Sequence, residues 1–123
     1  MSEEDDTNAI YGTLIRVKEI NKLKKFYRDV IGLGDPVVDS NFWVEFKLAG
    51  NGLLVLEQGT NMSSSSKTSH LSCLIYVSDF ELTMKTLKSR ELKPELPAQE
   101  IPGRVTATVM DPEGNLITIY SYQ

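Results

Sequence analysis

The chain is poor in the residues that usually carry covalent or metal chemistry, with one cysteine and one histidine. A single cysteine excludes an internal disulfide, and its apolar strand neighbours predict that Cys73 is buried as a small hydrophobic group. This usage is typical of a reducing compartment, so we expect a cytoplasmic protein. With only one histidine and a cysteine predicted to face the core, neither a Ser-His-Asp triad nor a Cys-His pair is supported, and no catalytic residue is assigned.

An excess of basic charge and long apolar runs are also missing. The net charge of -4 argues against nucleic-acid binding, which needs clustered basic residues. No stretch approaches the about 20 apolar residues that cross a bilayer, so no membrane partner is expected. Residues 1–8 are acidic, lack the basic start and apolar run of a signal peptide, and are predicted to form a tail. A small molecule is the expected partner.

The sequence does contain an internal repeat, within 123 residues that suit a single domain. The first half predicts a strand over residues 10–17, an amphipathic helix from Ile20, and strands over residues 41–48 and 53–57. The second half follows the same order, since residues 77–80 match 17–20 and the alternating residues 105–109 match 42–46. Phe42, Val44 and Phe46 are expected on the helix-facing side. In both halves an acidic residue, Glu19 or Asp79, enters the helix, where exposed N–H groups favour it.

Neither unit is large enough to close a core alone, so the two are expected to pack together. We expect a domain over residues 9–123, with a first module at about 9–58, a serine-rich connector at 59–69 and a second module at about 70–123. The open faces of the two sheets would then curve around a shared cavity.

Three segments resemble the signatures of a known superfamily, namely LIRVKE at 14–19, FYRDVIGL at 26–33 and DPEGNLI at 111–117. On these motifs the chain resembles the vicinal oxygen chelate superfamily, which contains glyoxalase I, extradiol dioxygenases, fosfomycin-resistance enzymes and bleomycin-resistance proteins. The resemblance implies an α+β fold of two tandem βαβββ modules forming an open, barrel-like cavity. It also implies a homodimer in which both chains line each cavity.

Many members of that superfamily hold a divalent metal through the first and last strands of each module. Carried over by the motifs, those positions are Gly12, Val55, Ser72 and Thr118. None is a histidine, glutamate or aspartate, whereas a catalytic zinc usually needs three protein ligands of the imidazole, thiolate or carboxylate type. The resemblance and this departure together predict that no metal or other cofactor is held, the alternative being a divalent metal on substitute ligands.

Strand alternation places further polar and aromatic side chains on the cavity side. Arg16 is the most informative, since a half-buried guanidinium needs an anion and the glyoxalase I arginine at this motif position contacts the substrate carboxylate. An internal ion pair with Glu45 or Glu57 is the other interpretation. Aromatic walls with a few polar groups are typical of a small-molecule pocket, although they also fill narrow barrels. The candidate ligand-binding residues are Arg16, Trp43, Glu45, Glu57, His70, Tyr76, Thr106, Thr108 and Tyr120.

Three functions stay open on the sequence. The first is a metal-free binding protein of the bleomycin-resistance type, which sequesters an aromatic or anionic compound such as an antibiotic. The second is a glyoxalase-type lyase or dioxygenase whose metal is held by His70 with Glu45 or Glu57. The third is a protein-interaction module whose cavity is filled by its own side chains.

Overall fold

The computed structural model describes residues 11–59 and 71–122, and all of their side chains except those of residues 96–100. Both halves contain a strand, a helix and three further strands, as the repeat predicts. The first half comprises β1 (Thr13–Val17), α1 (Ile20–Lys25), β2 (Val38–Asp39), β3 (Trp43–Lys47) and β4 (Leu53–Gln58). The second comprises β5 (Cys73–Tyr76), α2 (Phe80–Ser89), β6 (Leu96–Ile101), β7 (Arg104–Met110) and β8 (Leu116–Tyr122).

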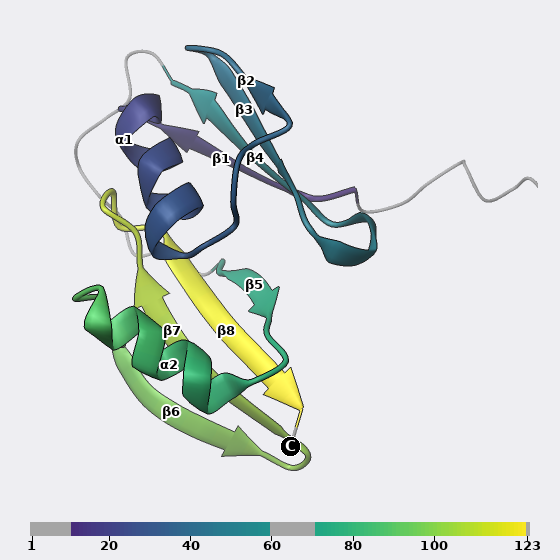
Figure 1. Cartoon of the computed structure of the whole chain (residues 1–123), viewed down its shortest axis with the longest axis vertical. Helices are drawn as coiled ribbons and strands as arrows, with labels where there is room; N and C mark the ends of the chain where they lie inside the picture. Colours follow the sequence, from purple (N-terminus) through teal and green to yellow (C-terminus); the bar gives the residue numbers. More distant parts are fainter. Residues whose placement is uncertain (1–10, 60–70, 123) are drawn as a thin grey trace, which may run out of the picture.

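The strands form two four-stranded sheets of the same topology. Sheet A has the order β1-β4-β3-β2 and sheet B the order β5-β8-β7-β6. In each sheet the first strand pairs in parallel with the last one, and the remaining pairs are antiparallel. The sheets lie one above the other along the long axis of the molecule, each with its helix on one side, and they do not close into a barrel (Figure 1).

One apolar core runs through both modules. On β3, Val44 and Phe46 are fully buried, and on β7, Val105, Ala107 and Val109 are at most 9% exposed, as alternation predicts. Phe42 is different, because it precedes β3 and is 72% exposed, so its expected place on the apolar face is wrong. The core cluster includes residues of both halves, among them Val17, Leu23, Tyr27, Leu54, Leu56, Cys73, Ile75, Leu87, Ile117 and Ile119.

The turn between β7 and β8 joins the two modules. The Tyr27 hydroxyl of the first module donates a 2.6 Å hydrogen bond to the buried Asp111 carboxylate in this turn. Burial and the nearby Asp111 carboxylate raise the pKa of Tyr27 well above its ordinary value near 10. The Glu113 carboxylate accepts hydrogen bonds from the backbone N–H groups of Lys18 and Glu19, which precede α1.

This arrangement corrects one expectation about the helix starts. The side chain of Asp79 caps α2 as predicted, accepting a 3.0 Å hydrogen bond from the Leu82 N–H. The side chain of Glu19 makes no such bond to α1. A carboxylate of the other module, that of Glu113, binds the N–H groups at the entry to α1 instead.

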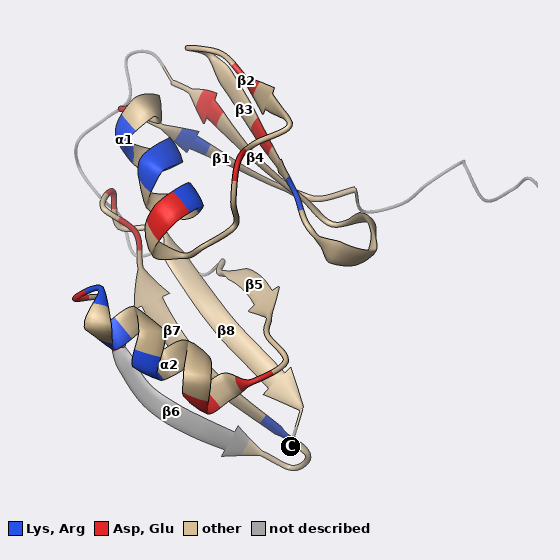
Figure 2. Ribbon diagram, viewed as in Figure 1, with Lys and Arg blue, Asp and Glu red and all other residues tan. Residues whose placement is uncertain are grey.

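Basic side chains lie on α1, whereas α2, with Glu81, and β3, with Glu45 and Lys47, carry both charges (Figure 2). In the part of the chain that the structure describes, no helix is long and apolar enough to cross a membrane. The predicted tail at 1–8, connector residues 60–69 and His70 lie outside the described residues.

Candidate functional site

The face of sheet A that turns away from the core carries four of the candidate residues. Arg16 on β1 and Glu57 on β4 are register partners and form an ion pair of 3.0 Å between Nη2 and Oε1. Their side chains are 60% and 34% exposed, so water screens the pair. Trp43 donates from its indole Nε1 to Glu45 Oε2 at 2.7 Å. Of the interpretations of Arg16 that the sequence left open, the structure therefore shows the internal ion pair, and the partner is Glu57.

The corresponding face of sheet B carries the other four described candidates. The rings of Tyr76 and Tyr120 lie 6.4 Å apart at their centroids, edge to face. Thr106 and Thr108 are half-buried on β7, and the Thr108 hydroxyl lies 3.1 Å from that of Thr118. The structure thus gathers the candidates into two groups, one on each sheet. Among these eight residues, no hydrogen bond, ion pair or ring contact joins one group to the other.

Sequence reasoning missed Arg104 and Tyr122 on this face. Arg104 and Tyr122 are register partners, and Arg104 Nε donates to the Tyr120 hydroxyl at 3.0 Å. The centroid of the Tyr122 ring lies 5.4 Å from that of Tyr120 and 5.7 Å from that of Tyr76. Alternation along β8 could have found Tyr122, which is two residues beyond Tyr120. Alternation along β7 could likewise have found Arg104, which is two residues before Thr106, and its register with β8 places it beside Tyr122.

Hydrogen bonds order the hydroxyl groups of this cluster. Hydrogen bonding from Tyr122, together with that from Arg104, lowers the pKa of Tyr120. The same Tyr122–Tyr120 contact raises the pKa of Tyr122, because ionising Tyr122 would remove the donated proton.

The four positions that the resemblance marks for metal ligands do not form a donor set. A Cβ at Gly12 would overlap the Leu53 backbone oxygen and lie 2.8 Å from the Leu53 Cβ, so this position has no room for a side chain. Val55 is 6% exposed and apolar. The hydroxyls of Ser72 and Thr118 lie 2.6 Å apart and are hydrogen-bonded to each other.

These residues do not fit a divalent metal, which prefers imidazole, thiolate or carboxylate donors. Within residues 11–59 and 71–122, no three histidine, cysteine, aspartate or glutamate side chains lie close enough together to hold one. The proposed substitute ligand His70 falls outside the described residues.

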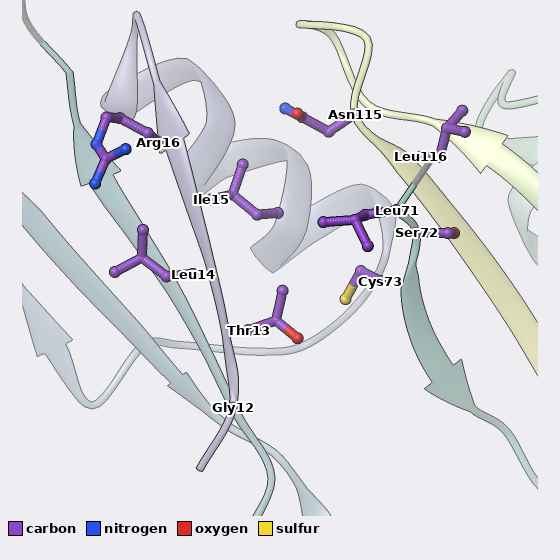
Figure 3. A pocket seen from close by; sticks show the side chains of 10 residues that line it. All are labelled: Gly12, Thr13, Leu14, Ile15, Arg16, Leu71, Ser72, Cys73, Asn115 and Leu116. Atoms are coloured by element: carbon purple, nitrogen blue, oxygen red, sulfur yellow. The ribbon is translucent and has the colours of Figure 1, made fainter. Parts of the chain in front are cut away.

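A cavity of about 470 Å³ opens between β1 and β5, the edge strands that the two sheets turn toward each other (Figure 3). Of the candidate ligand-binding residues, Arg16 lines this cavity. Gly12 and Ser72, two of the positions where the resemblance places metal ligands, line it as well. Apolar groups dominate the rest of the lining, which includes Leu14, Ile15, Leu71, Cys73 and Leu116. The cavity is therefore a partly polar opening at the junction of the modules, and the aromatic groups lie outside it.

A second hollow of about 460 Å³ lies on the other side of β5. Its lining includes Leu33, Leu48, Leu74 and Tyr76, with Lys47 as the charged residue. Tyr76 thus belongs both to this hollow and to the tyrosine cluster of sheet B.

No family model matches this sequence, and the search of curated proteins finds no relative. Solved structures do match over almost the whole chain. TnmS3, an antibiotic-binding protein from a Streptomyces species, has a TM-score of 0.76 and 21% identity, covering 96% of this chain and 98% of its own.

Two further structures give the same result. A glyoxalase/bleomycin resistance protein from Catenulispora acidiphila has a TM-score of 0.71 and 16% identity, covering 91% of this chain and 96% of its own. A lactoylglutathione lyase from Agrobacterium tumefaciens has a TM-score of 0.71 and 22% identity, covering 92% of each chain. The chain therefore has the fold of these glyoxalase/bleomycin-resistance structures, as its sequence motifs predict.

Proposed function

We propose that this protein binds a small molecule on the open faces of its sheets and holds it unchanged, without a metal. The observation that carries the proposal is the chemistry of the four marked positions. Gly12 has no room for a side chain, Val55 is apolar, and the hydroxyls of Ser72 and Thr118 bond to each other. A lyase or dioxygenase of this fold would need carboxylate or imidazole donors there.

The open faces have the composition of a ligand-binding surface. Trp43 is 36% and Tyr76 is 56% exposed, and polar groups such as the Glu45 carboxylate and the Thr106 hydroxyl lie on the same faces. Aromatic area with a few polar groups suits a planar or amphipathic compound. The structural neighbour TnmS3, described as an antibiotic-binding protein, is a precedent for such capture on this fold.

A second copy of the chain is the proposed cover for these faces. Leu14 is 44% exposed, Leu74 60% and Tyr122 63%, which is a large apolar exposure for a folded domain. In a homodimer, sheet A of one protomer would face sheet B of its partner, and the two groups of candidate residues would line one cavity. The buried free thiol of Cys73 is compatible with the cytoplasm.

Ligand capture can be tested on the protein purified from cells by native mass spectrometry, elemental analysis and sedimentation. We expect a dimer, no stoichiometric metal, and a copurified or added compound that is recovered chemically unchanged. Binding should quench or shift the fluorescence of Trp43, the single tryptophan of the chain. Trp43→Ala should weaken binding about tenfold by calorimetry, whereas Phe42→Ala, which removes a neighbouring exposed ring outside β3, should not.

Other outcomes select the other functions. Stoichiometric nickel, zinc or iron that is lost on His70→Ala, together with turnover of an added substrate, would overturn the proposal in favour of a metal-dependent lyase or dioxygenase. Failure of a broad metabolite and antibiotic library to bind the dimer would favour a protein-interaction module.

A further inference from the structure

The two arginines on the open faces differ in what surrounds them. Arg16 on sheet A is neutralised by Glu57 at 3.0 Å, and Glu45 lies on the same face. Arg104 on sheet B forms no ion pair with any described residue. β5, β7 and β8 contain no acidic residue, so Arg104 is the one charged residue of these three strands (Figure 2).

Three tyrosine rings lie beside this unpaired guanidinium. Tyr76, Tyr120 and Tyr122 contact one another in every combination, with centroids 5.4 to 6.4 Å apart. Tyr76 and Tyr122 remain 56% and 63% exposed. The strand register produces the cluster, because Tyr76 pairs with Tyr120 across β5 and β8, and Arg104 pairs with Tyr122 across β7 and β8. The result is an exposed aromatic surface with one positive edge.

The hydrogen bonds of the cluster leave donors at that edge. The Tyr120 oxygen accepts from Arg104 Nε at 3.0 Å. The Tyr120 proton is then left to donate to another acceptor. The Arg104 Nη1 group donates to the Pro102 carbonyl at 3.3 Å, which leaves Nη2 outside the contacts of the described residues. A guanidinium and a phenol at one place are a charge-assisted donor pair for an anion.

We infer that the open face of sheet B binds a planar aromatic anion, with its ring against Tyr76 and Tyr122 and its acidic group on Arg104 and Tyr120. This inference rests on the proposed function and names the class of ligand. The face of sheet A has no equivalent group for the anion, because its arginine, Arg16, is already paired with Glu57. Arg104 pairs with no acidic side chain that the structure describes, and β5, β7 and β8 contain no acidic residue, so this face favours an anionic partner.

Three probes of one shape separate charge from ring contact: 2-naphthoate, 2-naphthamide and 2-naphthamidinium. Calorimetry at low salt should give a dissociation constant about tenfold lower for the carboxylate than for the amide, and the weakest binding for the amidinium. Arg104→Gln should reduce the preference for the carboxylate to about twofold or less, and Arg104→Lys should keep part of it. Tyr76→Leu should weaken the carboxylate and the amide by the same factor, because it removes ring contact only.

Arg28→Gln is the matched control, since it removes an arginine charge from the π-helical turn Phe26–Val30 that follows α1, where Arg28 pairs with Asp29 at 2.9 Å. It should leave the preference for the carboxylate unchanged. Thermal unfolding of every variant checks that the fold is retained, which is expected for the exposed Arg104.

The inference is overturned if the amide or amidinium binds as tightly as the carboxylate, or if Arg16→Gln rather than Arg104→Gln removes the preference. It is also overturned if none of the probes binds at millimolar concentration. These results leave the proposed function standing as long as the library experiment finds a ligand whose binding depends on Trp43.

Discussion

Replacing Tyr27 by phenylalanine tests whether the hydrogen bond between the modules stabilises the fold. The substitution removes the hydroxyl group that donates a 2.6 Å hydrogen bond to Asp111. Tyr27 has no exposed surface. Asp111 keeps its other partners, the backbone N–H groups of Glu113 and Asn115 and the Asn115 side-chain amide. A hydrogen bond to a charged group contributes about 1.5–3 kcal/mol, so we expect the free energy of unfolding to fall by about 2 kcal/mol at pH 7.

The change should be visible in ordinary unfolding experiments. For a domain of this size, a loss of about 2 kcal/mol corresponds to a fall in Tm of about 7 °C. Urea unfolding followed by circular dichroism gives the free energy directly, and the m-value should not change. Tyr11→Phe is the matched control because it removes the same hydroxyl from a side chain that is 77% exposed, and it should cost less than about 0.5 kcal/mol.

The pH dependence gives a second measurement on the same variant. The pKa of Tyr27 is raised in the folded protein, so its contribution to stability is complete below the unfolded pKa near 10 and is lost as pH rises above it. At pH 11 the unfolded phenol is ionised and the folded one is not, which takes about 1.4 kcal/mol from the native protein but nothing from Tyr27→Phe. The cost of the substitution should therefore shrink to about 0.6 kcal/mol at pH 11. A cost that stays constant from pH 7 to 11, or that Tyr11→Phe reproduces, would refute the reasoning.

Two further substitutions test other contacts of the same framework. Glu113→Ala removes the acceptor of two backbone N–H groups before α1 and should lower the free energy of unfolding by about 1–2 kcal/mol. Glu113→Gln keeps one acceptor oxygen and should cost less. An equal loss in both variants would show that the carboxylate does not act through these bonds. Gly12→Ala places a Cβ against the Leu53 backbone and should cost about 2–3 kcal/mol by denaturant unfolding. Gly52→Ala, whose Cβ would lie 3.3 Å from that of Leu48, should cost less, and equal costs would contradict the assigned clash.

The sequence predicted the features that depend on local pattern. Alternation placed Val44 and Phe46 on the buried side and Trp43 and Glu45 on the open side of β3, because successive side chains of a strand point to opposite faces. The repeat predicted the order of elements in both modules for a related reason. The periodicity and the helix start of each module can be predicted from its own sequence, because neither depends on what the module contacts.

Features that depend on pairing between distant segments could not be predicted in the same way. The partner of Arg16 stayed open between an external anion and two glutamates until the parallel register of β1 with β4 set Arg16 opposite Glu57. The place of Arg104 beside Tyr122 likewise follows from the register of β7 with β8. The N–H of Glu19, just before α1, is bound by a carboxylate 94 positions away, and the first helical N–H, that of Ile20, by the side chain of Gln58; no local capping pattern reveals either contact.

At the four positions where the resemblance places metal ligands, replacing a single side chain would not restore a set of metal donors. A metal-binding side chain at position 12 would require the start of β1 to move away from Leu53, which begins the paired parallel strand β4. Such a move would disturb the β1–β4 register that pairs Arg16 with Glu57. In the second module, the Ser72 and Thr118 hydroxyls bond to each other and Thr118 also bonds to Thr108, and neutral hydroxyls are poor ligands for a divalent metal. On the open face of sheet B, by contrast, Arg104 forms no ion pair with any side chain that the structure describes and donates to Tyr120, whose ring contacts those of Tyr76 and Tyr122.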